Sequence, residues 1–378
     1  MKKNLRNILV LGLGLMTTIT FAQDWDVDSR TRIDMSGEDG KMLTEQRATL
    51  GATWGGSDWG IHVSTDVNYD LGAADANGQQ VPAALGVYEA YASTSLMGYA
   101  NLTVGRQALD YGSGAIMSSN QFGARTTWDG MKFDLGLDMA DITFGYASRN
   151  AGTPDDANGV SMENKGSNIY MNVGKADGDW SANLLYAKST RTMLGTDQEG
   201  TNNGDGTAMG LDLSYALMGG ALGLDVSYNT NSGDTGTDDE EDMLSIGATY
   251  NVNDQMSVTA NQTTYGENGF DVAGTNMAGG FADNGNMGYL NANDMDRNVG
   301  ISYSMGAFSI GATMHQITNT GDDVAPSTTN GDYSRDVMEM SLGYTMSDNA
   351  SLSLQYASDT ENDADAVKHM WLTLNIRP

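Results

Sequence analysis

Charged side chains recur at every second position near the start of the sequence. The first run consists of Asp26, Asp28, Arg30, Arg32 and Asp34. Successive side chains of a β-strand point to opposite faces, so this spacing puts all five on one face. On the wall of a pore, opposed arginines and carboxylates filter solutes by size and charge. They can equally form a lattice of salt bridges that stiffens the wall, and both roles stay open.

The following strands carry more charged residues on the same water-facing side. In chain order these are Glu45, Arg47, His62, Asp66, Asp70, Glu89, Lys132 and Asp134. Later strands offer mostly Ser, Thr, Asn and Gly at inward positions. The charged exceptions there include Asp141, Asp212, Asp225 and Glu339. The predicted charge of the lumen is therefore concentrated in the first third of the chain.

Enzyme chemistry has little support in the sequence. The chain has three histidines and no cysteine. A Ser/His/Asp arrangement needs a histidine held between a nucleophile and a carboxylate. His62 shares the polar face of its strand with Asp66, which keeps a barrel hydrolase as an alternative. Neither a nucleophile elbow nor a His-x-x-x-His pair is present, so we expect no enzyme, no cofactor and no metal site.

The elements that would position these charges show a strict alternation of apolar and polar residues. In the stretch 337–346 every even-numbered residue from Met338 to Met346 is apolar, and the odd-numbered ones from Glu339 to Thr345 are charged, hydroxylic or glycine. Such a strand has one oily face and one wet face. The pattern recurs along almost the whole chain, which is typical of a sheet with lipid outside and water inside.

The alternation predicts about eighteen strands. They are expected at about 25–36, 42–54, 59–71, 86–96, 99–107, 124–137, 140–148, 166–174, 179–190, 207–217, 220–230, 242–252, 255–264, 295–305, 307–317, 334–346, 349–358 and 367–377. Every second connection is tight, as at Met218-Gly219, whereas most others are long and polar, as at 191–206. The fold class predicted is all-β: a transmembrane antiparallel up-and-down barrel with short periplasmic turns and long acidic extracellular loops.

Bulk composition narrows the partners. The 378 residues carry a formal charge of −30, and only 39% of them are hydrophobic. So acidic a chain lacks the basic patches that nucleic-acid recognition needs. Its acidic residues cluster between strands, for example in 234–242 and 359–365. We expect these runs to be solvated loops, and binding of divalent cations there is the weaker alternative.

The first 22 residues differ from the rest. Lys2, Lys3 and Arg6 precede a short apolar run, which Thr-Thr-Ile-Thr-Phe-Ala follows. This is the pattern of a secretory signal peptide, and the apolar run is too short for the roughly 20 residues of a membrane-spanning helix. We therefore predict a signal peptide at 1–22 and a single outer-membrane barrel domain at 23–378.

Four motifs in the first third are more specific than alternation alone. They begin at Glu89 (Glu-Ala-Tyr), Leu102 (Leu-Thr-Val-Gly-Arg-Gln), Leu109 (Leu-Asp-Tyr-Gly-Ser-Gly) and Arg125 (Arg-Thr-Thr-Trp-Asp-Gly). Together with the early Arg-Thr-Arg and Glu-Gln-Arg, they resemble the alginate-export family of outer-membrane β-barrel porins. The resemblance implies an eighteen-stranded monomeric barrel that acts as a channel.

The resemblance also adds candidate residues to the pore. It implies pore-lining roles for Arg30, Arg32, Arg47, Arg106 and Arg125. Arg106 has the parity of apolar residues in its strand, and so does Arg125 with Asp129, so a bulge or an inward-folding loop is needed to turn them inward. The complete set of predicted pore-lining residues is Arg30, Arg32, Asp34, Glu45, Arg47, Asp66, Glu89, Arg106, Arg125, Asp129 and Lys132.

These observations predict a porin in the outer membrane of a Gram-negative bacterium. It would pass small hydrophilic solutes, carbohydrates among them, by passive diffusion, and its partners would be outer-membrane lipid and those solutes. An alginate-like polysaccharide exporter is the first alternative, although acidic loops would repel a polyanion. An outer-membrane barrel enzyme and a surface-binding protein are the alternatives from other classes.

Overall fold

The computed structural model describes residues 22–37, 42–72, 81–121, 124–125, 127–151, 163–194, 202–233, 240–270, 290–319, 334–362 and 364–377. Within them, no helix is long and apolar enough to cross a membrane. Residues 1–21 of the predicted signal peptide lie outside the described part, as do the acidic residues 155–156, 234–239 and 322–323. The expectations for these segments therefore remain predictions.

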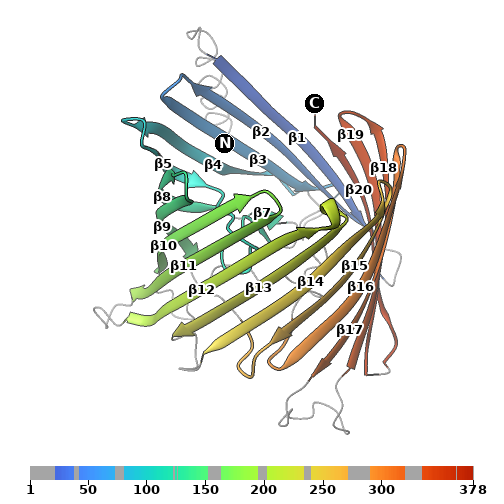
Figure 1. Ribbon diagram of the computed structural model, residues 1–378. Helices are drawn as coiled ribbons and strands as arrows, with labels where there is room; N and C mark the ends of the chain where they lie inside the picture. The colour runs from blue at the N-terminus through green and yellow to red at the C-terminus, as the bar shows by residue number, and fades with distance from the viewer. Residues whose placement is uncertain are drawn as a thin grey trace.

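Eighteen antiparallel strands form one closed sheet (Figure 1). They are β1 (Ala22–Asp34), β2 (Leu43–Gly55), β3 (Trp59–Asp70), β4 (Ala84–Leu96), β5 (Ala100–Gln107), β8 (Trp128–Gly136), β9 (Asp141–Ala151), β10 (Glu163–Asp177), β11 (Trp180–Leu194), β12 (Asn202–Leu217), β13 (Leu222–Gly233), β14 (Glu241–Asn253), β15 (Met256–Tyr265), β16 (Asp294–Met305), β17 (Phe308–Asn319), β18 (Ser334–Ser347), β19 (Ala350–Glu361) and β20 (Val367–Ile376). Closure comes from β1, which pairs with both β2 and β20. The barrel and its strand number confirm the predicted fold class.

Two short elements lie outside this sheet. The strands β6 (Asn120–Gln121) and β7 (Ala124–Arg125) pair only with each other in a small hairpin. The prediction of one strand at 124–137 is therefore wrong at its start, because β8 begins at Trp128. A 3-10 turn, η1 (Met218–Gly220), joins β12 to β13.

The outer face of the barrel is apolar. Exposed hydrophobic side chains point outward from strands all around the sheet, among them Ile61, Leu211, Ile301, Met340 and Tyr344. The alternating stretch at 337–346 lies in β18, and its even-numbered residues are exposed as the pattern predicts. Lipid would remove these side chains from water, at about 25 cal/mol per Å² of apolar surface.

Tight turns join the strand pairs at one end of the barrel. At Met97-Gly98 both residues have positive φ, of 54° and 74°, and at Met218-Gly219 φ is 54° and 68°. At Met97-Gly98 the N–H of Tyr99 donates to the carbonyl of Leu96 at 3.0 Å, so these two residues form the hairpin turn whose twist matches that of the flanking strands. The 218–221 connection is longer and has a third positive φ, of 89°, at Gly220. Glycine at the second position makes this conformation cheap.

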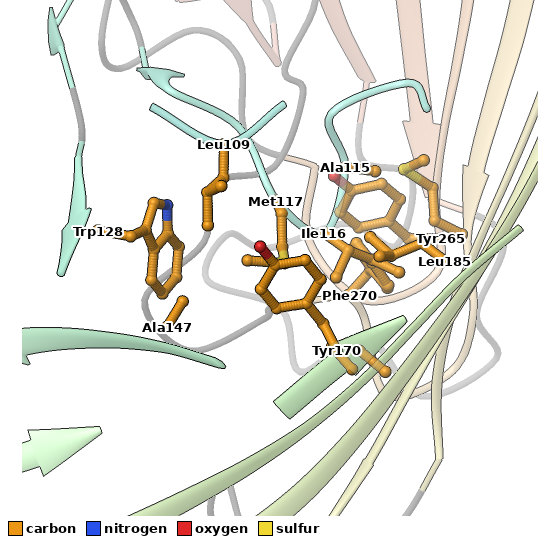
Figure 2. Close-up of a cluster of buried hydrophobic side chains, with 13 residues drawn as sticks. Leu109, Ala115, Ile116, Met117, Trp128, Ala147, Tyr170, Leu185, Tyr265 and Phe270 are labelled. Carbon is orange, nitrogen blue, oxygen red and sulfur yellow. The ribbon is translucent and has the colours of Figure 1, made fainter. Parts of the chain in front are cut away.

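The main hydrophobic cluster lies inside the barrel. It forms where residues 108–119, which follow β5, pack against the inner wall (Figure 2). We call residues 108–119 the inward segment. The chain thus places its best-packed apolar side chains where a loop, rather than a strand, crosses the lumen.

Candidate functional site: the lumen and its inward segment

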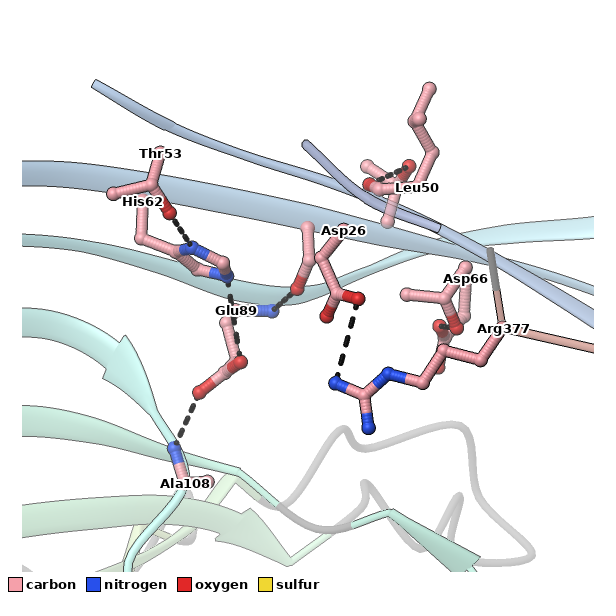
Figure 3. A network of polar contacts seen from close by, with 11 residues as sticks. Asp26, Leu50, Thr53, His62, Asp66, Glu89, Ala108 and Arg377 are labelled. Carbon is pink, nitrogen blue, oxygen red and sulfur yellow. Dashed lines mark hydrogen bonds and ion pairs between the residues drawn. The ribbon is translucent and has the colours of Figure 1, made fainter. Parts of the chain in front are cut away.

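The inward segment begins where the barrel wall is shortest. Strands β5 and β8, which flank it, have 8 and 9 residues, whereas the neighbouring β4 has 13. At the turn into the lumen, the backbone N–H of Ala108 donates to Oε1 of Glu89 at 3.1 Å. Glu89 therefore fixes the point at which the chain leaves the wall (Figure 3).

Apolar side chains anchor the inward segment to the inner wall at β10 and β11. Ala115, Ile116 and Met117 are at most 2% exposed and pack with wall residues such as Tyr170 and Leu185. Full burial of a side chain of this size contributes about 1.5–3 kcal/mol. Three consecutive buried residues in a loop therefore hold the segment across the lumen.

A tyrosine pair reinforces this contact. The Tyr111 hydroxyl donates to the Tyr170 hydroxyl at 3.3 Å, and the two rings lie 5.4 Å apart. Burial raises the pKa of the Tyr111 hydroxyl, with the neighbouring Tyr170 adding to the shift. Tyr111 therefore stays neutral, as a buried hydrogen-bonding side chain should.

The tip of the inward segment touches the wall through its backbone. Gly112 has a φ of +58°, and a Cβ built on it would lie 1.8 Å from Oδ2 of Asp212. Glycine is thus required twice, for the left-handed backbone and for the close approach. Beside it, Ser227 Oγ donates to Ser113 Oγ at 3.0 Å.

Ion pairs dominate the lumen wall formed by β1 and β2. Arg32 contacts Oε2 of Glu45 through Nε at 3.2 Å and Nη2 at 2.8 Å. Nη2 of Arg47 lies 4.0 Å from Oδ1 of Asp28. Arg30 lies opposite Arg47 in the register of the two strands. The predicted alternation thus brings arginines and carboxylates together on this wall.

Strands β3 and β4 continue this wall with a group of side chains around His62 (Figure 3). His62 Nδ1 lies 2.8 Å from Thr53 Oγ1, and Nε2 lies 3.6 Å from Oε2 of Glu89. Its ring stacks on Tyr91 with centroids 5.0 Å apart. The hydrolase alternative grouped His62 with Asp66, but Asp66 instead accepts from Thr49 Oγ1 at 2.6 Å. We call eight of the inward ionisable residues of β1–β4 the paired wall; they are Asp28, Arg30, Arg32, Glu45, Arg47, His62, Asp66 and Glu89.

Two other predicted pore residues have close local partners. Nζ of Lys132 lies 3.3 Å from Oδ2 of Asp134 on the same strand, β8. At the end of β1, Oδ1 of Asp34 accepts the backbone N–H of Ser36 at 2.8 Å. Both side chains are therefore engaged in short-range contacts at inward positions.

Arg106 and Asp129 lie on the outer face, which corrects their prediction as pore-lining residues. They are register partners in β5 and β8, and Arg106 shares the parity of the exposed Val104. Arg106 Nε and Nη2 donate to the two carboxylate oxygens of Asp129 at 2.7 and 2.8 Å. The chain does contain the inward loop that the prediction required, but it starts after Arg106. Arg125 lies in β7, outside the barrel sheet.

The opposite wall has a different chemistry. A cavity of about 440 Å³ lies against the tip of the inward segment. Every strand from β11 to β16 contributes two inward residues to it, in two neighbouring rows of the register. We call these residues the carboxylate wall; they are Ser181, Asn183, Asp212, Ser214, Asp225, Ser227, Ser245, Gly247, Asn261, Thr263, Asp296 and Asn298.

The carboxylate wall holds three acidic side chains and no basic one among its residues. Ser214 Oγ donates to Asp225 Oδ1 at 2.6 Å, and Asn261 Nδ2 donates to Asn298 Oδ1 at 3.2 Å. In the order of the sheet, β11–β16 lie about half a turn from β1–β4. The lumen therefore has a paired wall facing a carboxylate wall.

Asp296 is the most enclosed acid of the carboxylate wall. It is 6% exposed, and its Oδ2 accepts from Asn298 Nδ2 and lies 2.9 Å from His315 Nδ1. On the other side of that ring, Nε2 of His315 lies 3.7 Å from Glu339. Sequence parity had placed Asp212 and Asp225 inside, but the prediction left all three acids out of the site. The three acids were missed because the sequence of one strand does not show which residues of the neighbouring strands lie beside its own.

Among the described residues, no group of three or more His, Asp or Glu side chains is arranged to hold a metal ion. The predicted binding of divalent cations to the acidic loops concerns segments that mostly lie outside this part of the chain. It remains a prediction.

No protein-family model and no curated protein matches the sequence. Solved structures do match. OccK11 (OpdR) of Pseudomonas aeruginosa has a TM-score of 0.69 and 12% identity, over 94% of this chain and 95% of that one. OccK3 (OpdO) of the same species has a TM-score of 0.67 and 16% identity, over 98% and 99%. The outer membrane protein OpdK, also of P. aeruginosa, has a TM-score of 0.70 and 12% identity, over 94% and 98%.

At these identities the likeness establishes the fold: a closed eighteen-stranded barrel over nearly the full length of each partner. The match to an outer membrane protein agrees with the predicted location in that membrane. The resemblance to the alginate-export family is not among these matches.

Proposed function

We propose that this protein is an outer-membrane channel through which small hydrophilic solutes diffuse passively. The observation that carries the proposal is the combination of an apolar exterior, a polar lumen and a loop that narrows the lumen. Lipid requires a closed sheet, since an open edge would leave backbone groups without partners. A filled or purely structural barrel would have no need of a cavity with polar lining residues beside a loop that packs inside the barrel.

The pore lining follows from the same geometry. We assign Arg30, Arg32, Asp34, Glu45, Arg47, Asp66, Glu89 and Lys132 to the lumen wall. Glu89 has a second task, because it fixes the start of the inward segment at Ala108. On this proposal 23–378 is one barrel domain and 1–22 is the export signal.

Export of an alginate-like polyanion is the less favoured alternative. The carboxylate wall would repel a chain of uronates beside the tip of the inward segment. OpdK, which shares the fold, has been solved with vanillate, and this supports a small-molecule route. Passage of carbohydrates stays within the proposal, since hydroxyl and amide groups line the cavity.

Single-channel recording in planar bilayers tests the proposal. Purified protein should insert and give stable unitary steps in KCl. Removal of the apolar anchor, by replacing Ile116 and Met117 with serine, should free the inward segment and raise the unitary conductance. Complete absence of conductance from correctly folded protein would rule out both the diffusion channel and the exporter.

A further inference from the structure

The cavity beside the tip of the inward segment has an unbalanced charge. Asp212, Asp225 and Asp296 line it, and none of its lining residues is Lys, Arg or His. On the paired wall, by contrast, arginines lie within ion-pair distance of carboxylates. Asp212 and Asp225 therefore have hydroxyl and amide neighbours but no counter-charge along the lining, whereas Asp296 pairs with His315, which is not among the lining residues.

Two of these acids also have an oxygen that lacks a hydrogen-bond partner. Asp296 is only 6% exposed. Its Oδ2 contacts Asn298 Nδ2 and His315 Nδ1, whereas its Oδ1 has no hydrogen-bond partner among the described residues. Asp212 Oδ1 is in the same situation, and so is the neighbouring Asn183 Nδ2. A buried carboxylate oxygen without a donor is unfavourable, which calls for a ligand with hydrogens to donate.

From this arrangement we propose that the cavity is a binding subsite for a small organic cation with an ammonium or guanidinium group. The inference rests on the proposed channel function and names the class of solute that the constriction retains. N–H donors of such a cation would reach the unpaired oxygens of Asp212 and Asp296, and the exposed carboxylate of Asp225 would accept a further N–H from it. The cavity volume of about 440 Å³ suits a small molecule.

A divalent metal ion fits the site less well. Hard cations need several oxygen ligands converging on one point, and no group of three acidic or histidine side chains in the described chain does so. Instead the three acids lie on β12, β13 and β16, in two neighbouring rows of the register that span five strands. A planar or elongated cation with separated N–H groups matches such spread acceptors, with serine and asparagine oxygens between them.

Neighbouring residues hold the subsite in shape. His315 and Asn298 fix Oδ2 of Asp296, so that the other oxygen is the one left for a ligand. Glu339 orients His315 from its far side. Gly112 closes the cavity against Asp212 and Asn183, so the segment that narrows the lumen also forms one side of the subsite.

The test is block of the channel current by agmatine, which carries an ammonium and a guanidinium group. In planar bilayers with KCl, agmatine should interrupt the unitary current of the wild-type channel, while glucose and acetate should not. Asp296→Asn and, separately, Asp225→Asn should raise the half-blocking agmatine concentration about tenfold, because each removes a charge-assisted hydrogen bond. Asp348→Asn, which removes one charge from a turn outside the lumen, should leave the block unchanged.

The possible results separate the two proposals. Folded protein without unitary currents would overturn the channel itself. Open channels that agmatine blocks equally in the wild type and in both lumen variants would overturn the subsite alone. Block by Mg²⁺ at the same concentrations as agmatine would overturn the assignment to an organic cation. An unchanged midpoint of urea unfolding establishes that each variant has folded, and if Asp296→Asn does not fold, Asp225→Asn carries the test.

Discussion

The two facing walls of the lumen differ in how their charged side chains are compensated. On the paired wall, Arg32 and Glu45 neutralise each other at 2.8 Å, and Arg47 faces Asp28. On the carboxylate wall, Asp212, Asp225 and Asp296 have no basic residue among the lining residues of their cavity. Charges that pair with each other stiffen the wall, whereas Asp212 and Asp225, which have no basic partner along the cavity, are available to a passing solute. Asp296 lies beside them and shares its charge with His315. The richest charge pattern in the sequence is therefore not the most available one.

The largest effect is expected when the carboxylate wall is neutralised. The triple substitution Asp212→Asn, Asp225→Asn and Asp296→Asn should lower the ratio of cation to anion permeability by about tenfold. Each carboxylate near a passing ion contributes on the order of 0.5–1 kcal/mol in a water-filled lumen. The measurement is the reversal potential under a KCl gradient, and an unchanged potential would mean that these acids do not face the ion path.

A smaller effect is expected when the paired wall is broken on one side only. Glu45→Gln leaves Arg32 without its carboxylate partner and should shift selectivity toward anions by roughly two- to threefold, since a partly exposed ion pair is worth about 0.2–1 kcal/mol. The double variant Glu45→Gln with Arg32→Gln should return to the wild-type reversal potential. If the single variant behaves like the wild type, the wall charges only stiffen the barrel.

Gly112 seats the inward segment on Asp212 of the carboxylate wall. Gly112→Ala should cost about 1–2 kcal/mol of docking, from the left-handed backbone and the close contact together. We expect noisier currents with a second, larger conductance level, recorded in single channels. Gly178→Ala is the matched control, because that glycine also has a positive φ, of 58°, but lies in a turn with nothing near its Cβ. If the Gly178→Ala control shows noise of the same kind, the noise does not come from undocking of the inward segment.

The smallest effect on permeation is expected from Arg106→Ala. Arg106 pairs with Asp129 on the outer face, at side-chain exposures of 41% and 53%. Its loss should lower the midpoint of urea unfolding slightly, by about 0–1 kcal/mol of stability, and leave the reversal potential at the wild-type value. A shift in selectivity would return Arg106 to the lumen, where the family resemblance had put it.

The barrel was readable from the sequence because its signal is local. The alternation from Met338 to Met346 needs only one strand to be recognised, and all eighteen strands followed from it to within a few residues. The start of β8 was missed because the residues just before it, Ala124 and Arg125, form a separate hairpin instead. Short polar strands carry too little pattern to be assigned to one sheet or another.

The site was less predictable because it depends on contacts between distant segments. Leu109 and the apolar run at 115–117 look like an ordinary loop until the wall that buries them is known. Likewise, Asp212 and Asp296 share a cavity through the register of five strands, which no single strand encodes. One signal was present: an apolar run in a connection that should be polar, beside glycines, marks a loop that packs inward.

The most direct test of this account is the reversal potential of the wild-type channel under a tenfold KCl gradient. If the arginines and carboxylates of the paired wall largely offset one another and the carboxylate wall faces the ion path, single channels should be open and prefer K⁺ over Cl⁻, and the triple neutralised variant should lose that preference. An open wild-type channel that prefers Cl⁻ would contradict the account, because its current would then be set by the arginines of β1 and β2.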